Sequence, residues 1–295
     1  MRYESPLLRG FFYFCYMSWT GELQKKMAGW YINTLSWVAP TYAARLAFSL
    51  FSNPRDGRLN ADALPECLSE AKQSTLSFSN YEIQTYEWEA EGPRILLVHG
   101  WESNASRWEL LLPYLKGKAH VIALDGPSHG LSKGRFNLFN YAQCIDEVVR
   151  KYQPQVLIGH SLGGATSVYY QHQYQASSIE RMAVLGAPAE MRLLLDYYAN
   201  LIGLSVRAQK LLMRYMQAKF KVDPQVFSSQ AFTADFGIEG FIAHDELDEL
   251  IPVQQAEKTA GTWKKVQLHY TKGFGHALHS EEMYAHLQRF VLQYR

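Results

Sequence analysis

The fold is indicated by one short stretch of sequence, residues 155–164, which reads QVLIGHSLGG. Its first half is an apolar run of the length typical of a strand buried on both faces. Its second half follows the pattern G-x-S-x-G, with Gly159, Ser161 and Gly163, and helical spacing of apolar residues continues to Tyr174. The pattern describes a sharp strand-to-helix turn, where any side chain two residues before or after the serine would collide. The stretch therefore predicts a nucleophilic serine raised above the edge of an α/β sheet.

Further buried strands are expected on both sides of this stretch. The apolar or alternating runs that predict them are residues 83–88, 94–99, 120–125, 155–159, 182–186, 240–244 and 266–270. Helical spacing separates several of them, at residues 138–151, 161–174 and 280–294. Repeated alternation of strand and helix is typical of βαβ units. We therefore expect an α/β fold with a mostly parallel central sheet flanked by helices.

Two segments depart from this alternation. Residues 1–74 contain no convincing strand and are typical of helices broken by prolines. Residues 190–230 follow a strand but have the pattern of two helices, with Gly203 between them and Ser205 as a cap for the second. We expect a helical N-terminal extension over 1–74 and an α/β domain over 75–295, with 190–230 inserted as a helical lid.

Composition excludes several classes of protein. The 295 residues carry 29 Lys and Arg against 28 Asp and Glu, a net charge of +1, and no basic run suggests a nucleic-acid partner. The three cysteines, Cys15, Cys67 and Cys144, are odd in number and lack C-x-x-C spacing, which favours a reduced compartment. The aromatic stretch at residues 11–19 is shorter than the roughly 20 residues that span a bilayer. We expect a cytoplasmic protein without a transmembrane segment, metal site or cofactor.

A nucleophilic serine needs a base, and the base needs an acid to orient it. His276 lies in a glycine-containing loop after the last predicted strand, whereas His279 is expected to pack in the following helix. Several acids follow the strand that ends near residue 244. They are Asp245, Glu246, Asp248 and Glu249. The chain order serine, acid, histidine is that of hydrolases with the G-x-S-x-G pattern.

Several blocks of sequence, in the same order, resemble the α/β-hydrolase superfamily, in its lid-bearing, esterase and serine-aminopeptidase-like branch. They are HGW at 99–101, DGPSHGLS at 125–132, the turn at Ser161, HDELD at 244–248 with Ile251-Pro252, and Gly275-His276. The resemblance covers about residues 80–295. It implies that Ser161 is the nucleophile and His276 the general base. Asp248, four residues before the proline, stands where the family keeps its acid, with Asp245 as the alternative.

The resemblance also implies an oxyanion hole made of two backbone N–H groups, those of Leu162 and Trp101. The Trp101 ring is at the same time a candidate wall of the acyl pocket. Asp245, if it is not the acid, is expected to stabilise its own turn, as aspartates at strand ends often do.

The function that the resemblance implies is a serine hydrolase, by default a carboxylic ester hydrolase acting through an acyl-enzyme. Thioesterase, acyltransferase and peptidase activities use the same triad and stay open, as does lyase or cofactor-free oxidoreductase chemistry. A serine in place of an aspartate argues against dehalogenases and epoxide hydrolases. The partner is then a small acyl substrate with an apolar acyl group. A different class of protein stays open too, a binding or scaffold protein. In such a protein the aromatic-rich segment of residues 1–74 would mediate a homodimer or peripheral membrane contact.

Overall fold

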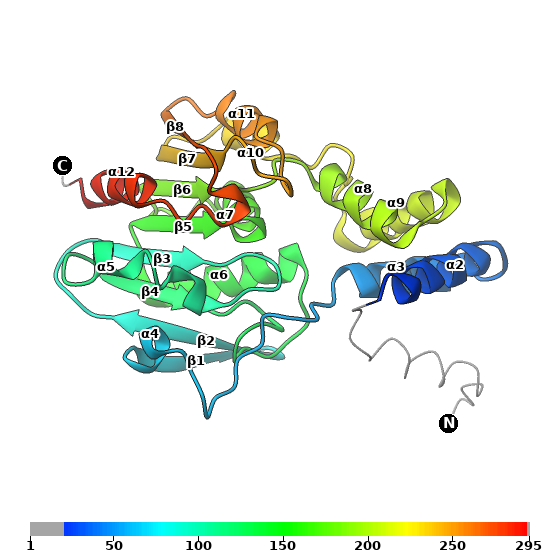
Figure 1. Cartoon of the computed structure of the whole chain (residues 1–295), viewed down its shortest axis with the longest axis horizontal. Helices are drawn as coiled ribbons and strands as arrows, with labels where there is room; N and C mark the ends of the chain where they lie inside the picture. Colours follow the sequence, from blue (N-terminus) through cyan, green and yellow to red (C-terminus); the bar gives the residue numbers. More distant parts are fainter. Residues whose placement is uncertain (1–20, 294–295) are drawn as a thin grey trace. The chain divides into compact units, whose positions relative to one another are not determined.

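A computed structural model of the chain describes residues 21–293, so the predictions on Cys15 and residues 11–19 lie outside the described residues. The chain divides into two compact units (Figure 1). Of the described residues, the helical unit contains 21–55 and 193–224, and the sheet unit contains 56–192 and 225–293. This division differs from the predicted one, because residues 56–74 group with the sheet. The predicted N-terminal extension and the predicted insertion contribute to the same unit.

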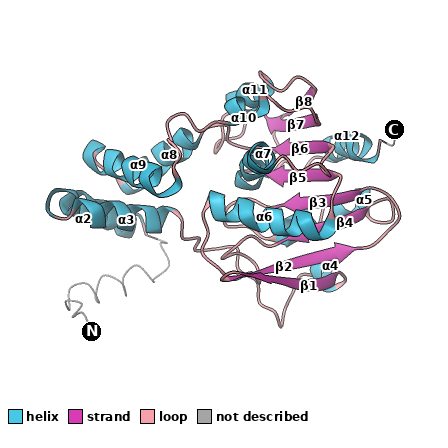
Figure 2. Ribbon diagram, turned by 180° about the vertical axis from the view of Figure 1, so that it is seen from behind, coloured by secondary structure: helices cyan, strands magenta, loops and turns pink. Residues whose placement is uncertain are grey.

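An eight-stranded sheet forms the centre of the sheet unit (Figure 2). Its order is β1-β2-β4-β3-β5-β6-β7-β8, with β1 and β2 antiparallel to their neighbours and the other pairs parallel. The strands are β1 (Lys72–Phe78), β2 (Tyr81–Trp88), β3 (Arg94–Val98), β4 (His120–Leu124), β5 (Val156–His160), β6 (Arg181–Leu185), β7 (Glu239–Asp245) and β8 (Val266–Thr271). The predicted fold class, a mostly parallel α/β-hydrolase sheet, is confirmed.

Helices cover both faces of this sheet. Along β3, Ile95 and Leu97 pack into one core and Leu96 and Val98 into the other, because successive side chains of a strand point to opposite faces. The first core is closed by α4 (Glu66–Ser69), η1 (Ala105–Trp108), α5 (Leu112–Leu115) and α12 (Glu281–Leu292). The second is closed by α6 (Leu138–Tyr152), α7 (Leu162–Tyr174), α10 (Ser229–Thr233) and α11 (Gln254–Ala260). Continuous apolar runs are what strands covered on both faces need.

Strand β1 corrects the expectation that residues 1–74 lack a strand. It begins at Lys72, pairs with β2 only, and reads KQSTLSF with mostly exposed side chains. An antiparallel edge strand needs no buried apolar run, because one edge and much of its surface face water. The hydrophobic pattern that predicted the other seven strands is therefore absent here.

The helical unit is formed by four helices, α2 (Glu22–Val38), α3 (Pro40–Phe51), α8 (Met191–Ile202) and α9 (Val206–Phe220). The first two residues of α8 belong to the sheet unit. The side-chain amide of Asn33 on α2 donates to Gly203 O at 2.9 Å and accepts from Ser205 N at 2.8 Å, which fixes the α8–α9 turn. As predicted, the Ser205 side chain caps α9. Gly29 lets α2 approach this turn closely, because a Cβ there would lie 1.7 Å from the carbonyl oxygen of Ile202. Segments about 170 residues apart thus build one unit.

Candidate active site

Ser161 lies on the turn between β5 and α7, with φ 53° and ψ −127°. Such a conformation is strained for a residue with a side chain. The neighbouring glycines permit the turn. A Cβ at Gly159 would lie 2.6 Å from Gly164 Cα, and one at Gly163 would lie 2.3 Å from His99 O. The predicted strand–turn–helix geometry of the G-x-S-x-G pattern is therefore what the chain adopts, and it presents the Ser161 side chain at the carboxyl end of the sheet.

His276 reaches this serine from η2 (Gly275–Ala277), in the loop after β8. Its Nε2 lies 2.9 Å from Ser161 Oγ, and its Nδ1 lies 2.7 Å from Asp248 Oδ2. A carboxylate can only accept, so Nδ1–H donates to Asp248 and leaves Nε2 free to accept from the serine hydroxyl. Three residues that are far apart in the sequence thus form one continuous chain of hydrogen bonds.

Asp248 is held in the loop after β7 by main-chain hydrogen bonds. Its Oδ1 accepts from Leu250 N at 2.9 Å and from Ile251 N at 3.0 Å. Its Oδ2, besides the bond to His276, lies 3.4 Å from His244 Nε2. Burial by itself would raise the pKa of the Asp248 carboxyl, but the hydrogen bonds from the two histidines and from Ile251 hold that pKa well below its usual value. The side chain therefore stays ionised beside His276.

Asp245, the alternative acid, makes a different set of contacts. It is fully buried and accepts from Leu247 N, Thr271 Oγ1, Gly273 N and Phe274 N at 2.9, 2.7, 3.2 and 2.9 Å. These bonds outweigh its burial and lower its pKa. They tie the turn after β7 to the loop that carries His276. Asp245 stabilises the loop, while Asp248 is the carboxylate that contacts the imidazole.

The other nearby candidates have partners elsewhere. His279 precedes α12 and does not lie in it as expected, but its Nδ1 lies 2.7 Å from Oη of Tyr284 on that helix. Glu246 pairs with Lys272 at 3.5 Å, and the Glu249 side chain is exposed.

His160, beside the nucleophile, donates from Nε2 to the backbone oxygen of His276 at 2.8 Å. Burial lowers its pKa well below the usual histidine value, so it is neutral and ties the two halves of the site together.

The loop after β3 lies against the serine. A Cβ at Gly100 would lie 2.9 Å from Ser161 Cβ, so the backbone at Gly100 is close to the serine. Trp101 is the next residue along this loop. His99 is fully buried and supports this loop, since its Nε2 accepts from Gly126 N at 2.7 Å and its Nδ1 donates to Gly100 O at 2.7 Å. Burial lowers the pKa of His99 to about 4, so the ring stays neutral.

Two N–H groups are then candidates for an oxyanion site. Leu162 is the first residue of α7, and the first N–H groups of a helix have no intrahelical acceptor. The dipole of α7 also favours negative charge there. The N–H of Trp101, on the loop that Gly100 brings against the serine, is the second candidate. The Trp101 ring contacts the buried Phe136 ring at a centroid distance of 5.0 Å and packs against the apolar core.

His244 is the contact that sequence reasoning did not assign. It is fully buried, and its Nε2 donates to Ile251 O at 2.8 Å while lying near Asp248 Oδ2. Only its position at the end of β7, four residues before Asp248, could have indicated it. Its role is to support the carboxylate together with the main chain.

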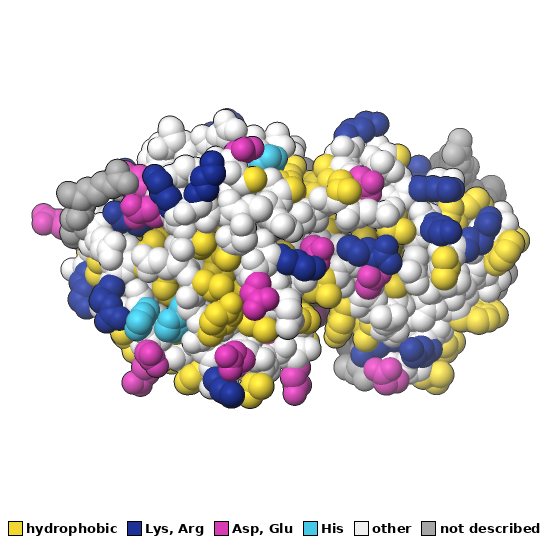
Figure 3. Space-filling model, turned by 90° about the horizontal axis from the view of Figure 1, so that it is seen from above, with side chains coloured by type: hydrophobic (Ala, Val, Ile, Leu, Met, Phe, Trp, Pro, Cys, Tyr) yellow, Lys and Arg dark blue, Asp and Glu magenta, His cyan; other side chains and the backbone are white. Residues whose placement is uncertain are grey.

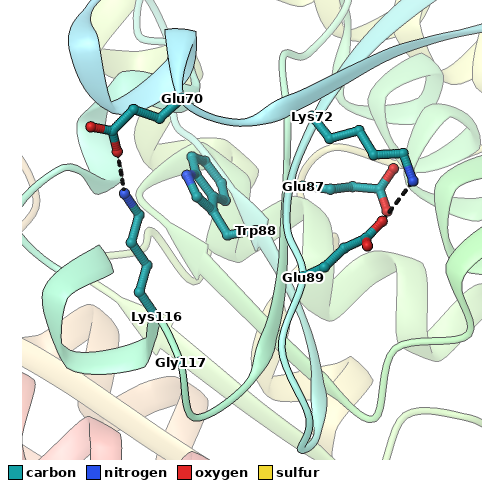
Figure 4. Close-up of a pocket in the computed structure, with 7 residues that line it drawn as sticks. All are labelled: Glu70, Lys72, Glu87, Trp88, Glu89, Lys116 and Gly117. Atoms are coloured by element: carbon teal, nitrogen blue, oxygen red, sulfur yellow. Dashed lines mark hydrogen bonds and ion pairs between the residues drawn. The ribbon is translucent and has the colours of Figure 1, made fainter.

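A pocket of about 410 Å³ lies at the other end of the sheet unit (Figure 4). Trp88 at the end of β2 pairs with Val121 near the start of β4, so this end is opposite the one that carries Ser161. The pocket's charged groups are paired, Lys72 with Glu89 at 2.6 Å and Lys116 with Glu70 at 2.9 Å. It has no part in the serine site. Among residues 21–293, no group of three or more His, Cys, Asp and Glu is placed to hold a metal ion.

The fold and the serine site define a class, and sequence comparison agrees with it: residues 95–288 match the alpha/beta hydrolase family, and the chain belongs to this family. A Drosophila melanogaster protein named "Probable serine hydrolase" is 36% identical over 84 residues, 26% of this chain and 25% of that protein. Human "Serine hydrolase-like protein 2" is 28% identical over 153 residues, 47% of this chain and 48% of that protein. The chain thus matches half or less of the length of these relatives.

Solved structures show the same fold. A bromoperoxidase from Bacillus anthracis superposes with a TM-score of 0.60 at 18% identity, covering 75% of this chain and 100% of that one. An esterase from Exiguobacterium antarcticum gives 0.57 at 15% identity, covering 72% and 96%. At these identities the likeness concerns the fold alone, because one fold hosts many chemistries. The chain belongs to the alpha/beta hydrolase family, and any reaction it catalyses has to be argued from its own site.

Proposed function

We propose that this chain is a serine hydrolase that cleaves a carboxylic ester or a related acyl bond through Ser161, His276 and Asp248. The observation that carries the proposal is the unbroken hydrogen-bond chain from Ser161 Oγ through the imidazole to a carboxylate that stays ionised. A serine in a strained turn, a base that can accept its proton, and an acid that orients the base are the parts that nucleophilic acyl transfer requires.

The reaction follows from the direction of these hydrogen bonds. Ser161 Oγ attacks the substrate carbonyl carbon as its proton passes to His276 Nε2, and the resulting imidazolium is stabilised by Asp248. The N–H groups of Leu162 and Trp101 bind the oxyanion. Collapse of the tetrahedral intermediate breaks the bond to the leaving group, which takes the proton from Nε2. Water, deprotonated by the same nitrogen, then attacks the acyl-enzyme and releases the acid.

The surroundings of the serine favour an apolar acyl group. The Trp101 and Phe136 rings contact each other, and Leu162 packs against the same apolar core. An ester fits this sequence of steps, because its leaving alkoxide takes one proton from the imidazole. Thioesters and amides place the same demands on the triad, so the class of leaving group is decided by assay.

A fluorophosphonate probe, which reacts with activated serines, tests the proposal. We expect it to label the wild type and the Ser69→Ala control, which removes an exposed serine on α4, but not Ser161→Ala. No labelling of the folded wild type would contradict the proposal and favour a non-catalytic binding protein. A panel of p-nitrophenyl esters with short, medium and long acyl chains then tests the substrate. Labelling without turnover of any ester would overturn the assignment as an ester hydrolase and favour thioester or amide substrates.

A further inference from the structure

Helix α2 of the helical unit is apolar on two opposite faces. One face carries Ala28, Gly29, Ile32 and Ser36, which are buried within the unit. An α-helix advances 100° per residue, so a second set of side chains lies on the opposite face within a band about 100° wide. This set, the outer stripe, consists of Leu23, Met27, Trp30, Thr34, Trp37 and Val38.

The outer stripe is exposed along its whole length. The exposed fractions are 73% for Leu23, 69% for Trp30, 73% for Trp37 and 76% for Val38. A surface helix that packs on one face usually has polar residues on the other. Two tryptophans and several aliphatic side chains exposed in one row mark an interaction surface, because contiguous apolar surface of this kind is rare on proteins without a partner.

The charge of the helical unit supplies the second observation. Residues 21–55 and 193–224 contain nine Lys and Arg and three Asp and Glu, whereas residues 56–192 and 225–295 contain 18 basic and 24 acidic residues. The near-neutral total of the chain thus hides a basic helical unit. On α9, Arg207, Lys210 and Arg214 are exposed on one side of the helix, opposite the side that it buries.

The apolar and basic surfaces are adjacent. The Arg207 guanidinium on α9 lies 4.4 Å from the centre of the Trp37 ring on α2. Figure 3 shows Lys and Arg side chains interspersed with apolar ones over the helical unit, at the right of that view. Among the described residues, no helix is long and apolar enough to cross a bilayer.

We propose that the helical unit docks the protein onto an anionic lipid bilayer, with the outer stripe of α2 inserted at the level of the headgroups and the basic side chains of α9 bound to lipid phosphates and carboxylates. Tryptophan is suited to this depth because its ring is apolar while its N–H stays hydrated. Nucleic acid fits less well, since Leu23, Met27 and Val38 offer no flat ring for base stacking. The inference goes beyond the proposed reaction and does not depend on it.

Co-sedimentation of the full chain with vesicles tests the proposal. We expect binding to vesicles of equal parts phosphatidylcholine and phosphatidylserine, weakened by salt, and much weaker binding to phosphatidylcholine alone. Trp30→Ser with Trp37→Ser should reduce binding at least about tenfold. Lys210→Gln with Arg214→Gln should reduce it about fivefold per charge on anionic vesicles only. The matched controls are Lys264→Gln with Lys265→Gln, and Leu110→Ser, exposed residues of the sheet unit that should bind like the wild type.

Three results would overturn the proposal. The first is that the tryptophan variant and the wild type bind anionic vesicles equally, or that neither binds them. The latter is the result expected when another part of the chain covers the stripe. The second is retention of the wild type by nucleic acid but not by vesicles. The third is a wild-type dimer that the tryptophan variant converts to a monomer, which would assign the stripe to a second copy of the chain. Labelling by the fluorophosphonate probe should be unchanged in every variant, so failure here leaves the proposed reaction standing.

Discussion

Replacement of Asp248 by asparagine should lower turnover strongly by reversing one hydrogen bond. The Oδ1 position accepts from the N–H groups of Leu250 and Ile251, so the amide oxygen of an asparagine must occupy it. The amide NH2 then takes the Oδ2 position, 2.7 Å from His276 Nδ1 and 3.4 Å from His244 Nε2. Because an NH2 group only donates, it turns Nδ1 of His276 into an acceptor and moves the ring proton to Nε2.

The magnitude follows from this tautomer. With a proton on Nε2, His276 cannot accept the proton of Ser161, and no carboxylate stabilises the imidazolium. The same change in a serine protease triad lowers kcat about 10⁴-fold. We expect a similar loss here, about 5.5 kcal/mol of transition-state stabilisation. KM should change little, since Asp248 is buried behind the histidine and does not contact substrate.

The assay is steady-state hydrolysis of the best p-nitrophenyl ester, with unfolding of each variant followed by circular dichroism. Asp245→Asn is the matched control, three residues away at the end of β7. It loses hydrogen bonds that hold the loop and should lower the free energy of unfolding by about 1–3 kcal/mol, with a smaller loss of kcat. If Asp245→Asn damaged kcat more than Asp248→Asn in folded protein, the assignment of the acid would be wrong.

Three further outcomes are expected. Folding lowers the pKa values of Asp245 and Asp248, so both carboxylates stabilise the protein above their unfolded pKa of about 4, and this stabilisation is lost as the pH falls below it. In denaturant unfolding, the free energy of unfolding of Asp245→Asn should therefore fall less towards about pH 3 than that of the wild type. An equal fall would contradict this. Gly163→Ala places a Cβ 2.3 and 2.4 Å from two carbonyl oxygens at the end of β3 and should lower stability by about 1–3 kcal/mol, while Gly237→Ala, with open space around it, should not. Asn33→Ala should increase hydrogen exchange in the α8–α9 turn, and unchanged protection there would show that α2 does not hold it.

Strands β3 to β7 were predictable because they are buried on both faces and carry continuous apolar runs, such as residues 94–98. Strands β2 and β8 were predicted from runs that include polar residues, and β8 is only partly buried at its edge of the sheet. Strand β1 was not predicted, because Lys72–Phe78 lies at an edge where polar side chains face water. Local sequence also determined the turn at Ser161, since the flanking glycines are required by contacts within the turn and with the adjacent strand.

The sequence narrowed the acid of the triad to Asp248, with Asp245 as the alternative, but did not decide between them. Asp245 ends β7 and Asp248 lies in the loop that follows, and both have pKa values lowered by several hydrogen bonds. What distinguishes them is which carboxylate meets an imidazole that arrives from 28 residues further along the chain. That depends on the path of the loop after β8, which Asp245 itself holds.

The sequence by itself determined seven strands of the sheet, the serine turn and the order of the three polar residues in the site, because periodicity and steric contacts within a few residues act wherever the chain goes. Only the tertiary structure decided that α2 and α3 join α8 and α9, that Asp248 contacts His276, and that one face of α2 remains exposed. Because hydrophobic burial is non-directional, the sequence of an apolar helix face predicts that the face is buried but not which segment covers it. The partner is selected by contacts between distant segments, such as that of Asn33 with the turn at Gly203.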